Sequence, residues 1–131
     1  MSQTRQTAAI DHLLARFAHS AQEPPPQRWR YLEAAHVLAQ NHFALHWRAH
    51  WRMLRHAITL RDGFEIRGQL GHLLMTPISH LVRFVPRGNT GRAIVPAMQP
   101  MVPGAAVREV IAQAMQATDP TADAHDAKPA P

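Results

Sequence analysis

Hydrophobic residues recur at spacings of three and four along most of the chain, which is the period of one face of an α-helix. Pro24, Pro25 and Pro26 break the pattern once, since proline is disfavoured in a helix interior, and Asp62-Gly63 breaks it again. No stretch of useful length alternates with the period of two that a strand shows. We therefore predict an all-α fold, a small bundle of four to five helices, at about residues 3–20, 27–40, 42–61, 64–85 and 105–117.

The connection between the last two predicted helices has a different composition. Residues 86–104 alternate prolines and glycines with apolar side chains, which predicts an extended segment packed on the helices. Within it, Gly88-Asn89-Thr90-Gly91 predicts a tight turn that pins the segment to the bundle. An anion contact, or a cover over a nearby site, is the alternative role of this turn. We expect one domain at residues 1–118 and a disordered tail at residues 119–131.

The third predicted helix separates its side chains in an informative way. With His42 placed at zero on a helical wheel, His46 and His50 fall inside an apolar arc of about 20° to 180°. Arg48, Arg52 and Arg55 fall on the opposite side, at about 220° to 280°. Surface histidines would have fallen among the arginines, so these two rings are expected to point inward. Trp47, Trp51 and Met53 share the apolar arc and are expected in the core.

Two inward imidazoles one helical turn apart are a familiar metal-binding geometry, because one ion satisfies both rings. The second predicted helix carries Glu33 and His36, and a hairpin at about residues 27–61 would place His36 opposite His46. The sequence therefore predicts a site for a divalent transition metal, such as zinc, iron, nickel or copper. Its candidate ligands are Glu33, His36, His46 and His50, with His42 as a further ligand if the start of its helix bends inward.

Other interpretations of the same residues remain open. The three histidines could be metal-free core residues of an interaction module, bonded to backbone carbonyls or to one another. An open coordination position would instead permit a metal-dependent hydrolytic or oxidative enzyme, with Glu33 as a base. The sequence does not decide whether any reaction is catalysed.

Composition narrows the function classes further. The 131 residues are 46% hydrophobic, which suits one folded domain. The absence of cysteine excludes disulfides, thiolate metal sites and a cysteine nucleophile. No apolar run is long enough to cross a bilayer and the N-terminus lacks a secretory pattern, so we expect a cytoplasmic protein with no membrane partner. A nucleic-acid-binding module that uses the arginine row of the third predicted helix is a further alternative. The moderate net charge of +5 and the lack of a helix-turn-helix pattern argue against a nucleic-acid partner. An exposed apolar edge formed by tryptophan side chains on a short bundle would also allow two copies of the chain to form a homodimer.

Three parts of the chain together resemble a known family. The string Leu32-Glu33-Ala34-Ala35-His36-Val37-Leu38-Ala39-Gln40 resembles an E-x-A-H-[VI]-L-x-Q block, with Ala39 where the family most often has glycine. The spacing His42-x-x-x-His46-x-x-x-His50-Trp51-Arg52-Met53-Leu54 and the later Gly88-Asn89-Thr90-Gly91 are also similar. The family is the bacterial "domain of unknown function 3703", and the resemblance covers about residues 28–105. It implies that these histidines and Glu33 are important, and it implies no activity.

Overall fold

The computed structural model describes residues 2–122, which form five helices and no strand. The helices are α1 (Gln3–Ala18), α2 (Pro25–Ala39), α3 (Phe43–Thr59), α4 (Gly63–Leu81) and α5 (Ala105–Ala117). The predicted all-α bundle is confirmed. None of the helices in this part of the chain is both long and apolar enough to span a bilayer.

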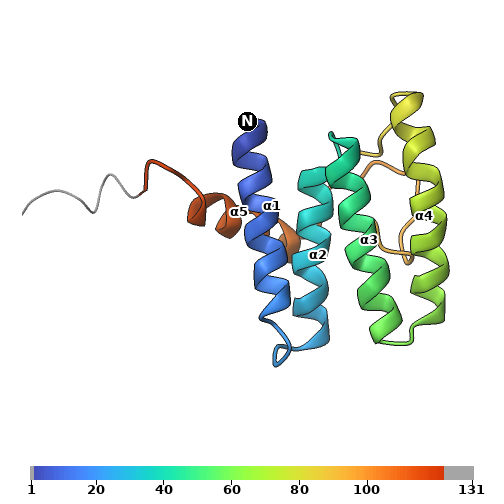
Figure 1. Cartoon of the computed structure of the whole chain (residues 1–131), viewed down its shortest axis with the longest axis horizontal. Helices are drawn as coiled ribbons and strands as arrows, with labels where there is room; N and C mark the ends of the chain where they lie inside the picture. The colour runs from blue at the N-terminus through green and yellow to red at the C-terminus, as the bar shows by residue number, and fades with distance from the viewer. Residues whose placement is uncertain (1, 123–131) are drawn as a thin grey trace, which may run out of the picture.

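Helices α1 to α4 lie side by side in chain order, and each runs antiparallel to the one before it (Figure 1). α5 packs against α1 and α2, while the extended segment between α4 and α5 runs beside α3 and α4 (Figure 1). Short connections fix this order, because antiparallel neighbours need only a tight link. α2 and α3 therefore form the predicted hairpin.

Local sequence explains where these helices begin. Ser2 caps α1 by accepting a hydrogen bond from the backbone N–H of Arg5, and the Asp62 side chain caps α4 in the same way through Glu65 N. α2 begins at Pro25, because a first-turn proline loses no helical hydrogen bond. α4 contains Pro77 and ends at Leu81, a turn earlier than the sequence predicted.

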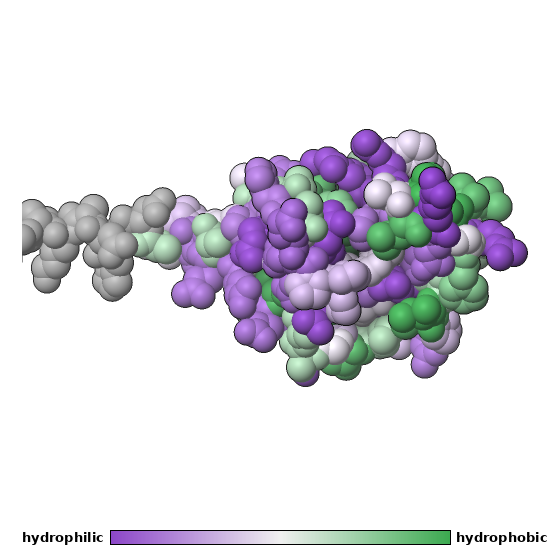
Figure 2. Space-filling view, turned by 90° about the horizontal axis from the view of Figure 1, so that it is seen from below, coloured by the Kyte–Doolittle hydropathy of each residue, from purple (hydrophilic) through white to green (hydrophobic). Residues whose placement is uncertain are grey.

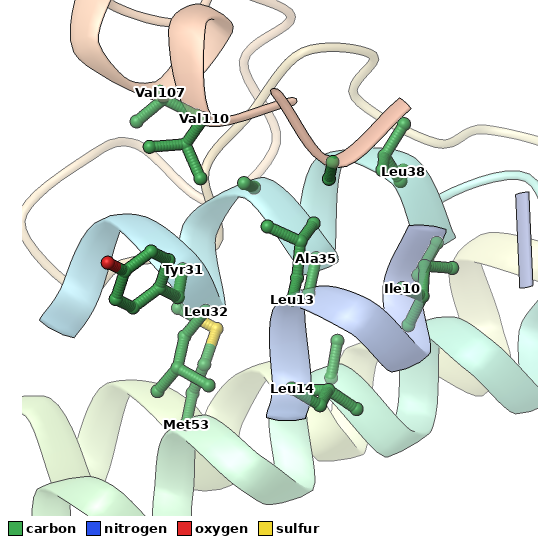
Figure 3. Packing of buried hydrophobic residues seen from close by; sticks show 14 of the residues in the cluster. Ile10, Leu13, Leu14, Tyr31, Leu32, Ala35, Leu38, Met53, Val107 and Val110 are labelled. Carbon is green, nitrogen blue, oxygen red and sulfur yellow. The ribbon is translucent and has the colours of Figure 1, made fainter. Parts of the chain in front are cut away.

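The main hydrophobic core lies between α1, α2, α3 and α5. Figure 3 shows Ile10 and Leu13 of α1 packed beside Ala35 of α2, with Met53 of α3 below Leu32 and Val110 of α5 above. The two buried sides of α2, toward α1 and toward α3, hold the hairpin in place. None of the fully buried residues in this core comes from α4.

α4 has the reverse of the usual amphipathic arrangement. Its buried side chains are mostly polar, namely Glu65, Gln69, Leu73, Thr76 and Ser79. Most of the apolar residues that recur at spacings of three and four along this helix are exposed, including Leu70, Leu74, Ile78 and Leu81. The expectation that Trp47 and Trp51 are core residues is also wrong, since both are exposed, whereas Met53 is fully buried.

The chain after α5 begins with a turn at residues 119–122, which an ion pair of 3.0 Å between Arg5 and Asp119 ties to α1. Residues 123–131, most of the predicted tail, lie outside the described part of the chain.

Candidate metal centre

Three histidines from α2 and α3 meet in the interior. Nε2 of His36 lies 3.0 Å from Nε2 of His50 and 3.0 Å from Nε2 of His46. One ring nitrogen from each residue lies within 4.8 Å of the other two, and all three side chains are buried. The structure thus brings together three of the five candidate ligands, with His36 facing both histidines of α3.

Hydrogen bonds at the far side of two rings determine where their protons are. The Asn89 carbonyl oxygen can only accept, so Nδ1 of His36 donates to it across 2.9 Å. Gln69 Nε2 donates to Glu65 Oε1 and to the Gly91 carbonyl, each at 2.8 Å, which leaves Gln69 Oε1 as an acceptor. Nδ1 of His50 therefore donates to Gln69 Oε1 across 2.8 Å. A neutral imidazole has one N–H, so both Nε2 atoms carry bare lone pairs that face each other.

His46 has one proton to donate, which is too few to separate all of the facing lone pairs. Its Nδ1 lies 2.8 Å from Nε2 of His80, and either nitrogen of that pair can be the donor. If His46 carries its proton on Nε2, it can donate to His36 but leaves the pair His36–His50 without a proton. If it carries the proton on Nδ1, all three Nε2 atoms are bare. Three neutral rings therefore always leave facing lone pairs, which a bound cation would stabilise.

The surroundings also keep the three rings neutral. Burial, followed by the neighbouring histidines, lowers the pKa of His46 to about 4. Burial and His46 lower the pKa of His50 to about 3, although its hydrogen bond to Gln69 acts in the opposite direction. Burial likewise places the pKa of His36 well below the ordinary histidine value. At neutral pH the cluster consists of uncharged imidazoles, the form that binds metal.

The turn at residues 88–91 covers this cluster. Besides the bond from His36 to Asn89 O, a Cβ atom placed on Gly91 would lie 2.8–2.9 Å from three atoms of the His36 ring. Gln40, the residue after α2, donates to the carbonyls of Pro86 and Asn89 and accepts from Gly88 N. The Gly91 amide donates to Asn89 Oδ1. The Asn89 amide donates to the Pro86 carbonyl, so three of the four backbone amides of the turn are already used, and the turn acts as a cover instead of an anion-binding nest.

Two candidate ligands lie outside the cluster. Glu33 forms an ion pair of 3.2 Å with Arg92, whose Nε also lies 3.1 Å from Glu65. Burial raises the pKa of Glu33, and the guanidinium of Arg92 opposes that change. His42 is the residue before α3, and its side chain is half-buried. Neither residue is in the group of three whose nitrogens converge.

The structure adds residues that the sequence prediction missed. A cavity of about 20 Å³, enough for about one water molecule, lies beside the three histidines. His72 of α4 lines it, with its ring centroid 4.9 Å from that of His50 and its buried Nδ1 lacking a hydrogen-bond partner. A signal for α4 was present, because polar residues recur every three or four positions at Glu65, Gln69, His72, Thr76 and His80.

Comparisons with known proteins agree with the family resemblance in the sequence. The model of a family described as "Protein of unknown function (DUF3703)" matches residues 4–115. Searches of curated proteins and of solved structures found no match. The matched region is longer than the part of the chain in which the resemblance was noticed, and it takes in α1 and most of α5. Because it includes well over half of the chain, the protein belongs to the DUF3703 family.

Proposed function

We propose that this protein binds a divalent transition metal ion between α2 and α3, through Nε2 of His36, His46 and His50. The observation that carries the proposal is the pair of bare lone pairs on His36 and His50, 3.0 Å apart in a buried site. A metal ion accepts both lone pairs at once, whereas a shared proton would have to charge a buried imidazole. Hydrogen bonds from Nδ1 to Asn89 and Gln69 orient the rings, as partners of metal-bound histidines commonly do.

The spacing of the nitrogens suits coordination by a small ion. Zinc–nitrogen bonds are about 2.0–2.1 Å long, so two nitrogens on a tetrahedral zinc lie about 3.3 Å apart. The two Nε2–Nε2 distances of 3.0 Å, from His36 to His50 and to His46, need to lengthen by only a few tenths of an ångström. A side-chain rotation of a few degrees is enough for that change.

The donor set favours one class of ions. Neutral imidazoles suit zinc, copper, nickel and iron, while calcium and magnesium prefer oxygen ligands. Because Glu33 is paired with Arg92, the atoms available to bind the ion directly are three histidine nitrogens and no carboxylate oxygen. We assign the protein a role in sensing, buffering or trafficking such an ion.

A metal-dependent enzyme is the second candidate, and the cavity is the observation that favours it. Three protein ligands leave one position of a tetrahedral ion open, as in catalytic zinc sites. The cavity beside the histidines has room for one water molecule, and His72 Nδ1 is a buried acceptor or donor without a partner. These features would suit hydrolytic or oxidative chemistry at a bound water.

The test is metal titration of protein purified without an affinity tag. Zinc, cobalt, nickel and copper are added in turn to wild type, to His46→Ala and to His19→Ala. His19 is an exposed histidine just after α1 and serves as the control. We expect one ion per chain in wild type and in the control, and loss of tight binding in His46→Ala. Circular dichroism establishes that each variant is folded.

The same titration separates the two candidates. If azide changes the visible spectrum of the cobalt-loaded protein, the fourth position is open and the enzyme is favoured. If the spectrum is unchanged, the site is closed and a buffering or sensing role is favoured. Wild type that takes up no metal, with an unchanged melting temperature in zinc, would contradict both.

A further inference from the structure

Exposed hydrophobic side chains are confined to one half of the described chain. Sixteen large hydrophobic residues are exposed, and all of them lie between Phe43 and Val102. α1, α2 and α5 expose none of this kind. Figure 2 shows the same asymmetry, with hydrophobic residues gathered toward the right-hand side of the view. Monomeric proteins seldom expose continuous apolar patches of more than a few hundred square ångströms.

α4 contributes one row of this surface. Leu70, Leu74, Ile78 and Leu81 recur at intervals of three and four residues, so they lie along one side of the helix. Leu74 is 72% exposed and Leu81 is 83% exposed. The opposite side of α4 is occupied by Glu65, Gln69 and the other polar side chains that face the histidines. The site therefore explains why the polar side of α4 is inside, and it leaves the apolar side without a partner.

α3 contributes a second row beside the first. Phe43, Trp47, Trp51 and Ile58 are exposed and recur at intervals of four and seven residues. α3 and α4 are packed neighbours, and the Phe43 ring lies 5.5 Å from the ring of His80 on α4. We call these two rows of four residues the α3–α4 apolar face.

We propose that the α3–α4 apolar face is the contact surface between two copies of this chain. The first reason is its size. The eight residues are between 37% and 83% exposed, so with about 200 Å² for the full surface of a large apolar residue they leave roughly 900 Å² open. Each partner in an interface of standard size buries about 800 Å². The exposed area is therefore what one stable dimer interface needs.

The second reason is the arrangement of the rows. Side chains at spacings of three and four form ridges that fit the grooves of another helix pair. A pair of antiparallel helices can meet an identical pair across a twofold axis and form a four-helix arrangement with a closed apolar interior. A dimer of this kind covers both rows at once, and it also removes Trp47 and Trp51 from water.

Sedimentation velocity at several protein concentrations tests the proposal. Wild type is compared with Leu74→Arg, in the middle of the face, and with the control Val102→Arg, at an equally exposed apolar residue of the extended segment. We expect wild type and the control to be dimers. Leu74→Arg should weaken association by roughly thirtyfold or more, as for a central interface residue. Circular dichroism checks that the variants keep their helices.

Tryptophan fluorescence gives a second measurement. Trp29 is buried within one chain, so its emission reports the fold in either state. Trp47 and Trp51 should emit at shorter wavelength in the dimer and shift to longer wavelength in Leu74→Arg. The proposal is overturned if folded wild type is a monomer at every concentration, or if Leu74→Arg dimerises as tightly as wild type. Monomeric wild type that cosediments with phosphatidylserine vesicles would assign the face to a membrane surface instead.

Discussion

Replacing Gln69 by leucine tests whether the hydrogen bonds around the histidines prepare them for a metal. Gln69 lies on the polar side of α4 and is fully buried. Its side chain accepts from His50 Nδ1 and donates to Glu65 and to the Gly91 carbonyl, each across 2.8 Å. Leucine occupies a similar volume and makes none of these bonds.

The size of the effect follows from the groups that lose their partner. The N–H of His50 and the carbonyl of Gly91 lose a buried partner in Gln69→Leu, whereas Glu65 keeps its contacts with Arg92 and Ala93 N. A buried unsatisfied polar group costs about 1–3 kcal/mol, so the loss of two partners should lower the free energy of unfolding by about 2–6 kcal/mol. Loss of the group that orients a metal-bound histidine typically lowers metal affinity by about 10–100-fold.

Urea denaturation of the metal-free protein and competition with a chromophoric chelator measure the two effects. Gln113→Leu, at an exposed glutamine on α5, is the matched control and should change neither quantity by more than about 0.5 kcal/mol. If Gln69→Leu has wild-type stability and wild-type zinc affinity, the hydrogen-bond arrangement described for His50 is wrong.

The remaining predictions concern the cover, the carboxylate and pH. Gly91→Ala should destabilise the fold by about 2–4 kcal/mol in a urea titration, because φ is +77° there and the new Cβ meets the ring of His36; wild-type stability would show that the turn does not pack on that ring. Glu33→Gln should leave the zinc affinity within about threefold of wild type, since the carboxylate pairs with Arg92; a larger loss by calorimetry would restore Glu33 as a ligand. Zinc affinity should be nearly constant from pH 7 to pH 5.5, because the pKa of His50 is about 3; an exposed histidine ligand would lose about tenfold over that interval. Between about pH 6.5 and pH 4 the unfolded chain binds protons that His46 and His50 do not bind when folded. The metal-free protein should therefore lose stability to urea as the pH falls through this window, and a flat profile would mean that the rings titrate normally.

The helices and the inward histidines could be predicted because both depend only on the spacing of hydrophobic and polar residues along the chain. The third predicted helix separates His46 and His50 from Arg48 and Arg55, and the structure buries the histidines and exposes most of the arginines. The hairpin of α2 and α3 then brings His36 to both rings. These relations involve residues close in sequence, whose relative positions the helix geometry fixes.

The spacing of apolar and polar residues does not say which side of a helix faces the core. α4 has an apolar row and a polar row, and the apolar row would ordinarily be assigned to the interior. The polar row is inside because Gln69 and Glu65 meet the hydrogen-bonding needs of His50 and of the segment around Gly91. The spacing of apolar residues also does not say how much of a wide apolar arc is buried. The arc of α3 includes Trp47 and Trp51, and both remain exposed.

The place of Glu33 depends on a contact between distant parts of the chain. Its position one turn from His36 is correct for a ligand, but Arg92 from the extended segment reaches its carboxylate. The guanidinium of Arg92 also stacks 3.8 Å above the ring of Trp29 and contacts Glu65. Such a long-range partner leaves no periodic signal in one sequence.

X-ray absorption at the zinc edge of the zinc-loaded protein tests the central claim most directly, because it counts the atoms bound to the ion. The arrangement of His36, His46 and His50 predicts a shell at about 2.0 Å with the scattering pattern of three imidazoles, and one further light atom at most. A shell of oxygen atoms with fewer than two imidazoles would contradict a metal centre formed by these three histidines.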